Sequence, residues 1–217
     1  MRTIKKGREP RSLERYRQTD GATYAGLPRE VKDEIQAQIV EEQRGICCYC
    51  QSRIRPSWDG MKIEHWQSQC DNKFPERQLD YSNMLGACLG GQKHGEKTPS
   101  ATHHCDTAKG ESDLCFSVCD SAHPIDHKIR FLGDGKISAN DADIDHAINA
   151  VLNLNLPLLV NNRKAVLSAF QQRLQKGRRV DPARELPKWD GSEAGELPEF
   201  AQVVVYWLRK KLTRGIV

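Results

Sequence analysis

Apolar residues recur at helical spacing near both ends of the chain and lose that spacing in the middle. One apolar stripe runs from Val31 to Ile39, with Pro28 before it and Gly45 after it. Proline in the first turn and glycine beyond the last turn are typical of helix ends. The spacing therefore predicts a helix over residues 27–45, with core packing as its role.

Similar stripes cover residues 144–152, 158–174 and 200–208. They predict three further helices, the second of them ending at Gly177. Residues 181–197 are rich in proline and glycine and predict a loop before the last helix.

The middle of the chain favours short strands. Residues 61–66 alternate between apolar and polar, which is typical of a strand, and residues 46–56 predict a turn and a second short strand. Asp134-Gly135 lies between short apolar stretches and predicts a hairpin. Residues 106–111 predict a short helix, whereas residues 67–80 and 89–104 predict loops.

These elements predict an α+β protein that is mostly helical, with four parts along its 217 residues. They are a basic irregular segment (1–26), the first helix (27–45), a cysteine-containing module (46–112) and a mostly helical C-terminal region (113–217).

Charge adds a possible ligand class. The net charge of +4 is small, but basic residues cluster in 1–17, 173–179 and 209–214. Such clusters suit phosphate backbones and suit solvated helix faces equally well. No apolar run is long enough to span a bilayer, and no signal peptide is recognised, so we expect a cytoplasmic protein without membrane contact.

Eight cysteines in a cytoplasmic protein favour metal binding over disulfides. The two-residue gap between Cys47 and Cys50 lets both sulfurs reach one zinc ion. A second set recurs at intervals of four and leaves open whether another metal binds there, although Pro124 argues against one continuous helix through it. That set comprises Cys115, Cys119, His123 and His127.

Four short motifs follow one another in a meaningful order. They are Cys47-x2-Cys50, Glu64-His65, Asn83-Met84-x3-Cys88 and Cys105-Asp106-x2-Lys109. The set resembles the HNH nuclease signature, in which a cysteine pair precedes an acid–His dipeptide, an Asn precedes a third cysteine, and a fourth cysteine is followed by Asn or His and then Lys. The resemblance implies a ββα-metal finger within residues 46–112.

The flanks resemble a narrower group. The basic N-terminus, the Asp-Gly hairpin and residues 150–155 before Arg163 are similar to the PtuB-type HNH proteins of Septu and retron anti-phage systems. This resemblance implies a nuclease effector that acts with an ATPase partner of the PtuA type.

The HNH resemblance also implies roles for single residues. His65 matches the general base, and Glu64 matches the acid beside it, a ligand or orienter of a catalytic Mg²⁺ or Mn²⁺. Asn83 matches the residue that fixes the loop between the strands. Asp106 falls at the last metal-ligand position, and Lys109 is a candidate contact to nucleic acid.

The same resemblance implies a structural zinc held by Cys47, Cys50, Cys88 and Cys105. The gap between Cys88 and Cys105 is far longer than the usual two residues, which leaves His94, His103 or His104 as alternative ligands for either metal.

The function expected from the sequence is metal-dependent hydrolysis of nucleic acid, with DNA as the expected substrate. The alternative is a non-catalytic zinc-stapled module that binds nucleic acid or protein. The sequence leaves open DNA versus RNA, sequence specificity, the trigger and the oligomeric state.

Overall fold

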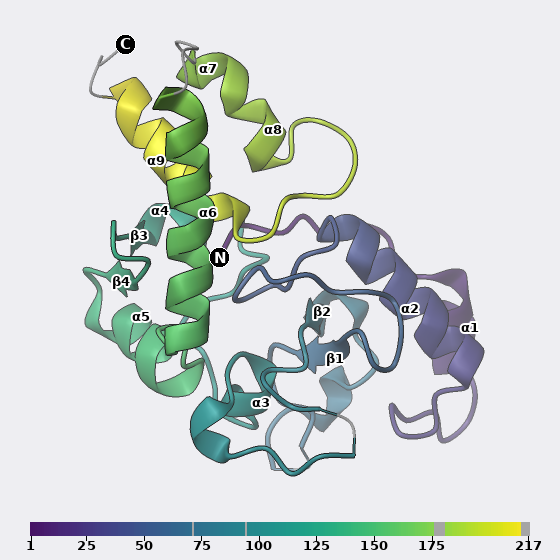
Figure 1. The fold of residues 1–217 in the computed structure, drawn as a ribbon. Helices are drawn as coiled ribbons and strands as arrows, with labels where there is room; N and C mark the ends of the chain where they lie inside the picture. The colour runs from purple at the N-terminus through teal and green to yellow at the C-terminus, as the bar shows by residue number, and fades with distance from the viewer. Residues whose placement is uncertain (71, 94, 176–180, 214–217) are drawn as a thin grey trace.

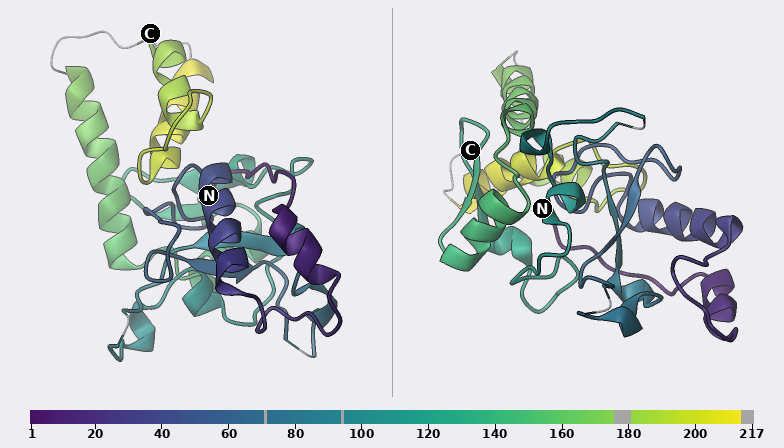
Figure 2. Two further views of the ribbon diagram at one scale, coloured as in Figure 1. Left: turned by 90° about the vertical axis from the view of Figure 1, so that its right-hand side faces the viewer. Right: turned by 90° about the horizontal axis from the view of Figure 1, so that it is seen from below.

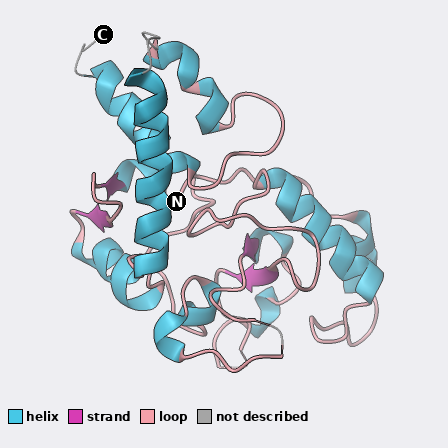
Figure 3. Ribbon diagram, viewed as in Figure 1, coloured by secondary structure: helices cyan, strands magenta, loops and turns pink. Residues whose placement is uncertain are grey.

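The computed structural model describes residues 1–70, 72–93, 95–175 and 181–213. Its elements are mainly helices, with two small two-stranded sheets (Figure 3). Figure 1 shows the two sheets on opposite sides of the molecule, with the long helix α6 beside one and the helices α1 and α2 beyond the other. The predicted class, α+β and mostly helical, is confirmed at this level.

The N-terminal part contains two helices. Helix α2 (Arg29–Glu42) confirms the predicted helix, because Val31, Ile35 and Ile39 are buried along one face. Helix α1 (Arg11–Arg17) was not expected in a segment predicted to be irregular. It begins directly after Pro10 and packs against α2, and Leu13 is fully buried, so tertiary packing stabilises a helix too short to hold by itself.

The first sheet pairs β1 (Lys62–His65) with β2 (Met84–Ala87) in antiparallel register, with His65 opposite Met84. Helix α2 packs directly on β2. Gly86 permits this approach, since an added Cβ atom would lie 2.8 Å from the side chain of Ile39. The strand predicted within 46–56 was wrong, because this segment contributes only an isolated bridge, Ile46 to Arg53.

Short helical turns complete the module. Three are 3₁₀ turns: η1 (Pro75–Arg77), η2 (Tyr81–Asn83) and η3 (Ser100–Thr102). Helix α3 (Asp106–Lys109) confirms the predicted short helix and ends at Gly110, whose φ of 52° suits glycine.

The second sheet confirms the predicted hairpin. Helix α4 (Ile125–Lys128) leads into β3 (Ile129–Phe131), which pairs with β4 (Ile137–Ala139). Gly135 in the turn has a φ of 92°, the conformation for which glycine is favoured.

The C-terminal region is helical, as predicted. It contains α5 (Ala142–His146), the π-helix η4 (Ala147–Val151), α6 (Pro157–Gln175) and α9 (Ala201–Thr213). The expected helix end at Gly177 lies outside the described residues. The turned views in Figure 2 show α6 and α9 side by side at one end of the molecule, in agreement with their contacts.

The loop predicted over 181–197 contains two short helices, α7 (Pro182–Glu185) and α8 (Pro187–Asp190). Each begins with a proline, and the Asp181 side chain accepts a hydrogen bond from the Ala183 amide at the start of α7. Both helices pack on α9, so the prolines mark helix starts here rather than a loop.

One main hydrophobic core joins the parts of the chain. It runs from Leu13 and Ile39 through the four buried cysteines to Ile148 and Leu208. Within the described residues, no helix is long and apolar enough to cross a membrane.

Candidate metal centre and active site

Four cysteines converge from three separate segments. Cys47 and Cys50 lie in the turn after α2, Cys88 follows β2 directly, and Cys105 precedes α3. Their sulfur atoms all lie within 4.8 Å of one another, and all four residues are buried.

The geometry of this cluster fits zinc. The Sγ atoms of Cys47 and Cys105 are 3.9 Å apart, and those of Cys50 and Cys88 are 3.6 Å apart. A tetrahedral zinc with Zn–S bonds of about 2.3 Å sets its sulfurs roughly 3.8 Å apart. A hydrogen bond with Cys105 lowers the pKa of Cys88 to about 6, which favours the thiolate that zinc requires. The four-cysteine zinc site is therefore supported.

The histidines offered as alternative ligands take other positions. His104 Nδ1 lies 3.2 Å from the Cys105 sulfur, as a hydrogen-bonding neighbour of the cluster. His103 Nε2 lies 2.9 Å from the Thr98 hydroxyl. His94 is outside the described residues. The fourth position therefore falls to Cys105.

The second metal set does not assemble. Within the described part of the chain, Cys115, Cys119, His123 and His127 do not form a group of potential ligands. His123 instead contacts Asp120 at 3.0 Å, and Cys115 is exposed.

The C-terminal region holds the fourth cysteine in place. The Cys105 amide donates to the Leu152 carbonyl at 2.9 Å, and the Asn153 side chain donates to the His103 carbonyl at 2.8 Å. The buried Arg163 of α6 donates to the Leu154 carbonyl at 2.6 Å and to that of Gly135. In the sequence, residues 150–155 indicate only a resemblance to a protein family, and no local pattern predicts their contact with the Cys105 segment.

Glu64 and Asp106 face each other beside the cluster. Glu64, on β1, is 2% exposed, and it accepts hydrogen bonds from the Tyr49 hydroxyl at 2.8 Å and the Lys109 ammonium at 2.9 Å. Burial, together with the neighbouring Asp106 carboxylate, raises the pKa of Glu64 well above its usual value, whereas Lys109 opposes this shift. Two neighbouring carboxylates repel each other when both are charged, so this arrangement favours a shared proton or a shared cation.

Asp106 lies at the start of α3 and remains partly exposed. Its carboxylate is 3.7 Å from the ammonium of Lys62, which also donates to the Thr107 hydroxyl at 2.8 Å. The structure thus brings Glu64 and Asp106 together, although 41 intervening residues separate them in the sequence.

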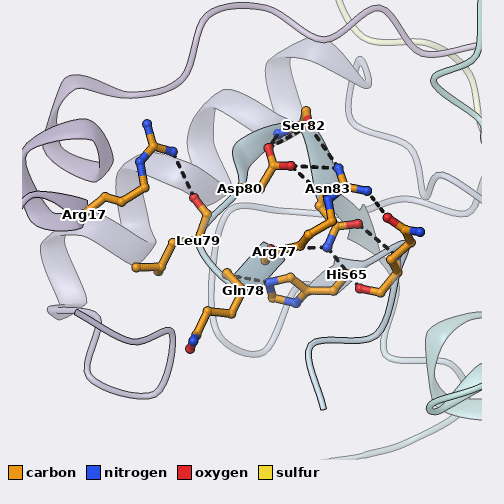
Figure 4. Close-up of polar contacts among 9 residues, drawn as sticks. Arg17, His65, Arg77, Gln78, Leu79, Asp80, Ser82 and Asn83 are labelled. Atoms are coloured by element: carbon orange, nitrogen blue, oxygen red, sulfur yellow. Dashed lines mark hydrogen bonds and ion pairs between the residues drawn. The ribbon is translucent and has the colours of Figure 1, made fainter. Parts of the chain in front are cut away.

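His65, the last residue of β1, points its Nε2 atom at the Gln78 carbonyl, 3.0 Å away (Figure 4). A carbonyl only accepts, so Nε2 carries the proton of the neutral ring and Nδ1 keeps its lone pair. The ring of Tyr24 packs edge-on against that of His65 at 4.6 Å. Burial lowers the pKa of His65, partly offset by the Gln78 carbonyl and Asp106.

Asn83 is fully buried and fixes the loop that carries Gln78. Its side chain accepts from the Gln67 amide at 2.9 Å and donates to the carbonyls of Gln67 at 3.0 Å and Arg77 at 3.3 Å. Figure 4 shows Asn83 beside Arg77, which forms an ion pair with Asp80. This arrangement is the one expected of a residue that orders the loop between two strands.

Lys109, expected at the nucleic acid, lies inside the protein. Its ammonium contacts Glu64 and donates to the His65 carbonyl at 3.1 Å, with a side chain 1% exposed. It links the two members of the acid–His pair.

Several residues of the basic clusters form ion pairs instead of an open cationic surface. Lys6 pairs with Glu42, Arg17 with Glu9, and Arg209 with Asp126. Lys176, Arg178, Arg179 and Arg214 lie outside the described residues.

No protein-family model matches this chain, and a search of curated proteins finds no match. The HNH resemblance therefore rests on the sequence motifs, and of these the structure supports the buried four-cysteine cluster.

Proposed function

We propose that this protein is a metal-dependent HNH endonuclease, which hydrolyses phosphodiester bonds in nucleic acid. One observation carries the proposal: Asp106, distant in sequence, lies against the adjacent Glu64-His65 pair beside a buried tetracysteine cluster. The antiparallel pair β1–β2 followed by α3 has the order of a ββα-metal finger, the arrangement implied by the HNH motifs.

His65 is suited to be the general base. Its Nε2–H is committed to the Gln78 carbonyl, so Nδ1 is the atom that takes a proton. Burial lowers the pKa of the ring and keeps it neutral near pH 7. In the proposed step the oxygen of a water molecule attacks phosphorus, its proton passes to Nδ1, and the bond to the 3′ oxygen breaks. The departing 3′ oxygen takes up a proton from solvent, so the products carry 5′-phosphate and 3′-hydroxyl ends.

Glu64 and Asp106 would hold the catalytic cation, because paired carboxylates suit Mg²⁺ or Mn²⁺. When bound, the cation would supply positive charge beside the phosphate and the departing oxygen. Lys109 and Tyr49 orient Glu64 toward this position through their hydrogen bonds. The four-cysteine zinc has a structural role, since its ligands are closed and buried.

The test is plasmid cleavage with Mg²⁺ or Mn²⁺ by the wild-type protein and by His65→Ala. We expect a loss of about 10²–10⁴-fold, the usual contribution of a general base. His123→Ala is the matched control, because this exposed histidine contacts only Asp120 among the partners described for it. Equal cleavage by the wild type and His65→Ala would contradict the proposal.

The non-catalytic alternative predicts the opposite pattern. Binding and biological effect would survive His65→Ala and Asp106→Ala and would be lost only with Cys47 or Cys50. The anti-phage role and the PtuA-type ATPase partner stay predictions of the resemblance. Copurification with a tagged ATPase tests the partner, and cleavage assays are then run with the complex as well.

A further inference from the structure

Trp58 is a large apolar side chain that the fold leaves outside its core. It is 65% exposed and lies in the turn that precedes β1. Backbone hydrogen bonds order this turn, from Ser57 to the Arg55 carbonyl and from Gly60 and Met61 to the Ser57 carbonyl. The indole ring is thus presented on a fixed support.

Trp58 is shared by the linings of two cavities. One has a volume of about 770 Å³ and is also lined by Arg29 and Lys32 of α2, and the other has a volume of about 520 Å³ and is also lined by Lys62 and Lys97. Both volumes fall within the range of roughly 300–1,000 Å³ that is common for ligand pockets. An aromatic side chain therefore borders two hollows that are lined by basic residues.

One lysine from each cavity lies near the proposed catalytic groups. The Lys32 ammonium lies 5.2 Å from the ring of Tyr24, which packs on His65. The Lys62 ammonium of the other cavity lies 3.7 Å from Asp106. A strand that crosses Trp58 could therefore place a phosphate beside each of these lysines.

The charges of the lining favour a polyanion. Five basic side chains line the two cavities against two acidic ones, Asp33 and Glu96. Each of these acids already pairs with a basic neighbour, Arg29 or Lys93. Lysines that flank an exposed aromatic ring are the combination by which proteins bind single-stranded nucleic acid, because the ring stacks on a base and the lysines contact phosphates.

We propose that Trp58 is a stacking platform for an unpaired nucleotide next to the scissile phosphate, with Lys32 and Lys62 at the flanking phosphates. The substrate class is then single-stranded nucleic acid, or a duplex with an unpaired nucleotide, because a base within a regular duplex has no free face for the indole. This inference rests on the proposed function and narrows its substrate.

The test measures binding separately from cleavage. Fluorescence anisotropy follows a labelled single-stranded oligonucleotide and a blunt duplex of the same sequence, in the His65→Ala background. Trp58→Ala, Trp58→Phe and a control, Leu158→Ala at an exposed apolar position of α6, are compared. A 2-aminopurine base in the single strand reports stacking directly, through quenching of its fluorescence by the wild-type protein.

We expect tighter binding of the single strand than of the duplex, and a loss of about 5- to 150-fold on Trp58→Ala, since stacking contributes about 1–3 kcal/mol per base. Trp58→Phe should retain most of the affinity, and Leu158→Ala all of it. Unchanged single-strand binding by Trp58→Ala, an equal loss for strand and duplex, or no quenching would overturn the inference. Failure of the catalytic proposal looks different, because His65→Ala would then cleave like the wild type whatever Trp58 does.

Discussion

The candidate metal centre and the proposed catalytic edge lie side by side, but they differ in how clearly their residue types alone indicate a function. The four cysteines have zinc-like spacing, are buried, and would supply all four ligands of a tetrahedral zinc ion. The edge formed by Glu64, His65 and Asp106 combines ordinary residues whose chemistry arises from their neighbours. The comparison teaches that a closed metal site can be identified from its residue types alone. The chemistry of a reactive site depends instead on which lone pairs and charges its neighbours leave available.

The largest expected effect concerns the metal centre. Cys105→Ser should abolish zinc binding and the cooperative fold, because structural zinc contributes about 10–16 kcal/mol in small zinc domains. Elemental analysis and circular dichroism measure this. Cys115→Ser is the control, since that cysteine is exposed and should keep a full zinc content. A folded, zinc-loaded Cys105→Ser protein would contradict the assignment of the four cysteines to a structural zinc site.

The next effect concerns the support of the catalytic edge. Lys109→Met removes the cationic partner of buried Glu64 and should cost about 3–5 kcal/mol of unfolding free energy. The pKa of Glu64 is already raised in the fold, so protonation relieves the variant at low pH, and its stability should fall as pH rises through that pKa. Urea denaturation over a pH series, without added Mg²⁺ or Mn²⁺, measures this trend. A loss of unfolding free energy that does not change with pH would show that the Lys109–Glu64 pair is not its cause.

A smaller effect is expected where the C-terminal region holds the zinc. Arg163→Met leaves the carbonyls of Leu154 and Gly135 without this donor and should cost about 1–3 kcal/mol. Zinc should also leave faster, as measured with a coloured chelator, since the segment that binds the Cys105 amide is loosened. Arg163→Lys should recover part of the loss. Arg184→Met, at a highly exposed position, is the control and should match the wild type.

The smallest effect is a shift in pH dependence. Burial lowers the pKa of His65, so the acid limb of the cleavage profile should lie below the ordinary histidine value of about 6.5. Activity should then hold as pH falls toward that value and disappear only when the ring is protonated. A limb above pH 6.5 that vanishes in His65→Ala would show that His65 is the base but that its pKa is not lowered, which would contradict this prediction.

Local patterns predicted the parts of the fold that carry their own signal. The stripe in α2, the Asp-Gly turn and the Cys47–Cys50 pair each depend on neighbouring residues, and all three are confirmed. Helix α1 was missed because it buries one leucine against α2, which no local period reveals. The prolines at the starts of α7 and α8 were interpreted as loop signals because only packing on α9 identifies them as helix starts.

Within the site, order along the chain carried more information than spacing. Because 16 residues lie between Cys88 and Cys105, no spacing rule identifies Cys105 as the fourth ligand. Its position in the fold is set by its own positive φ of 56° and by the hydrogen bond from its amide to the Leu152 carbonyl. Lys109 shows the opposite case: a basic residue in a nuclease-like motif suggested a surface contact, but its position beneath Glu64 follows only from the closure of α3 onto β1.

The bond between the Cys105 amide and the Leu152 carbonyl bears on whether residues 46–112 form a portable unit. Excised, that stretch would leave the start of α3 without its anchor and would lose the part of the shared core that Ile148 and Leu152 supply. A transplanted or minimised version would therefore have to bring along the 152–155 segment and the arginine that holds it, or redesign a substitute for both.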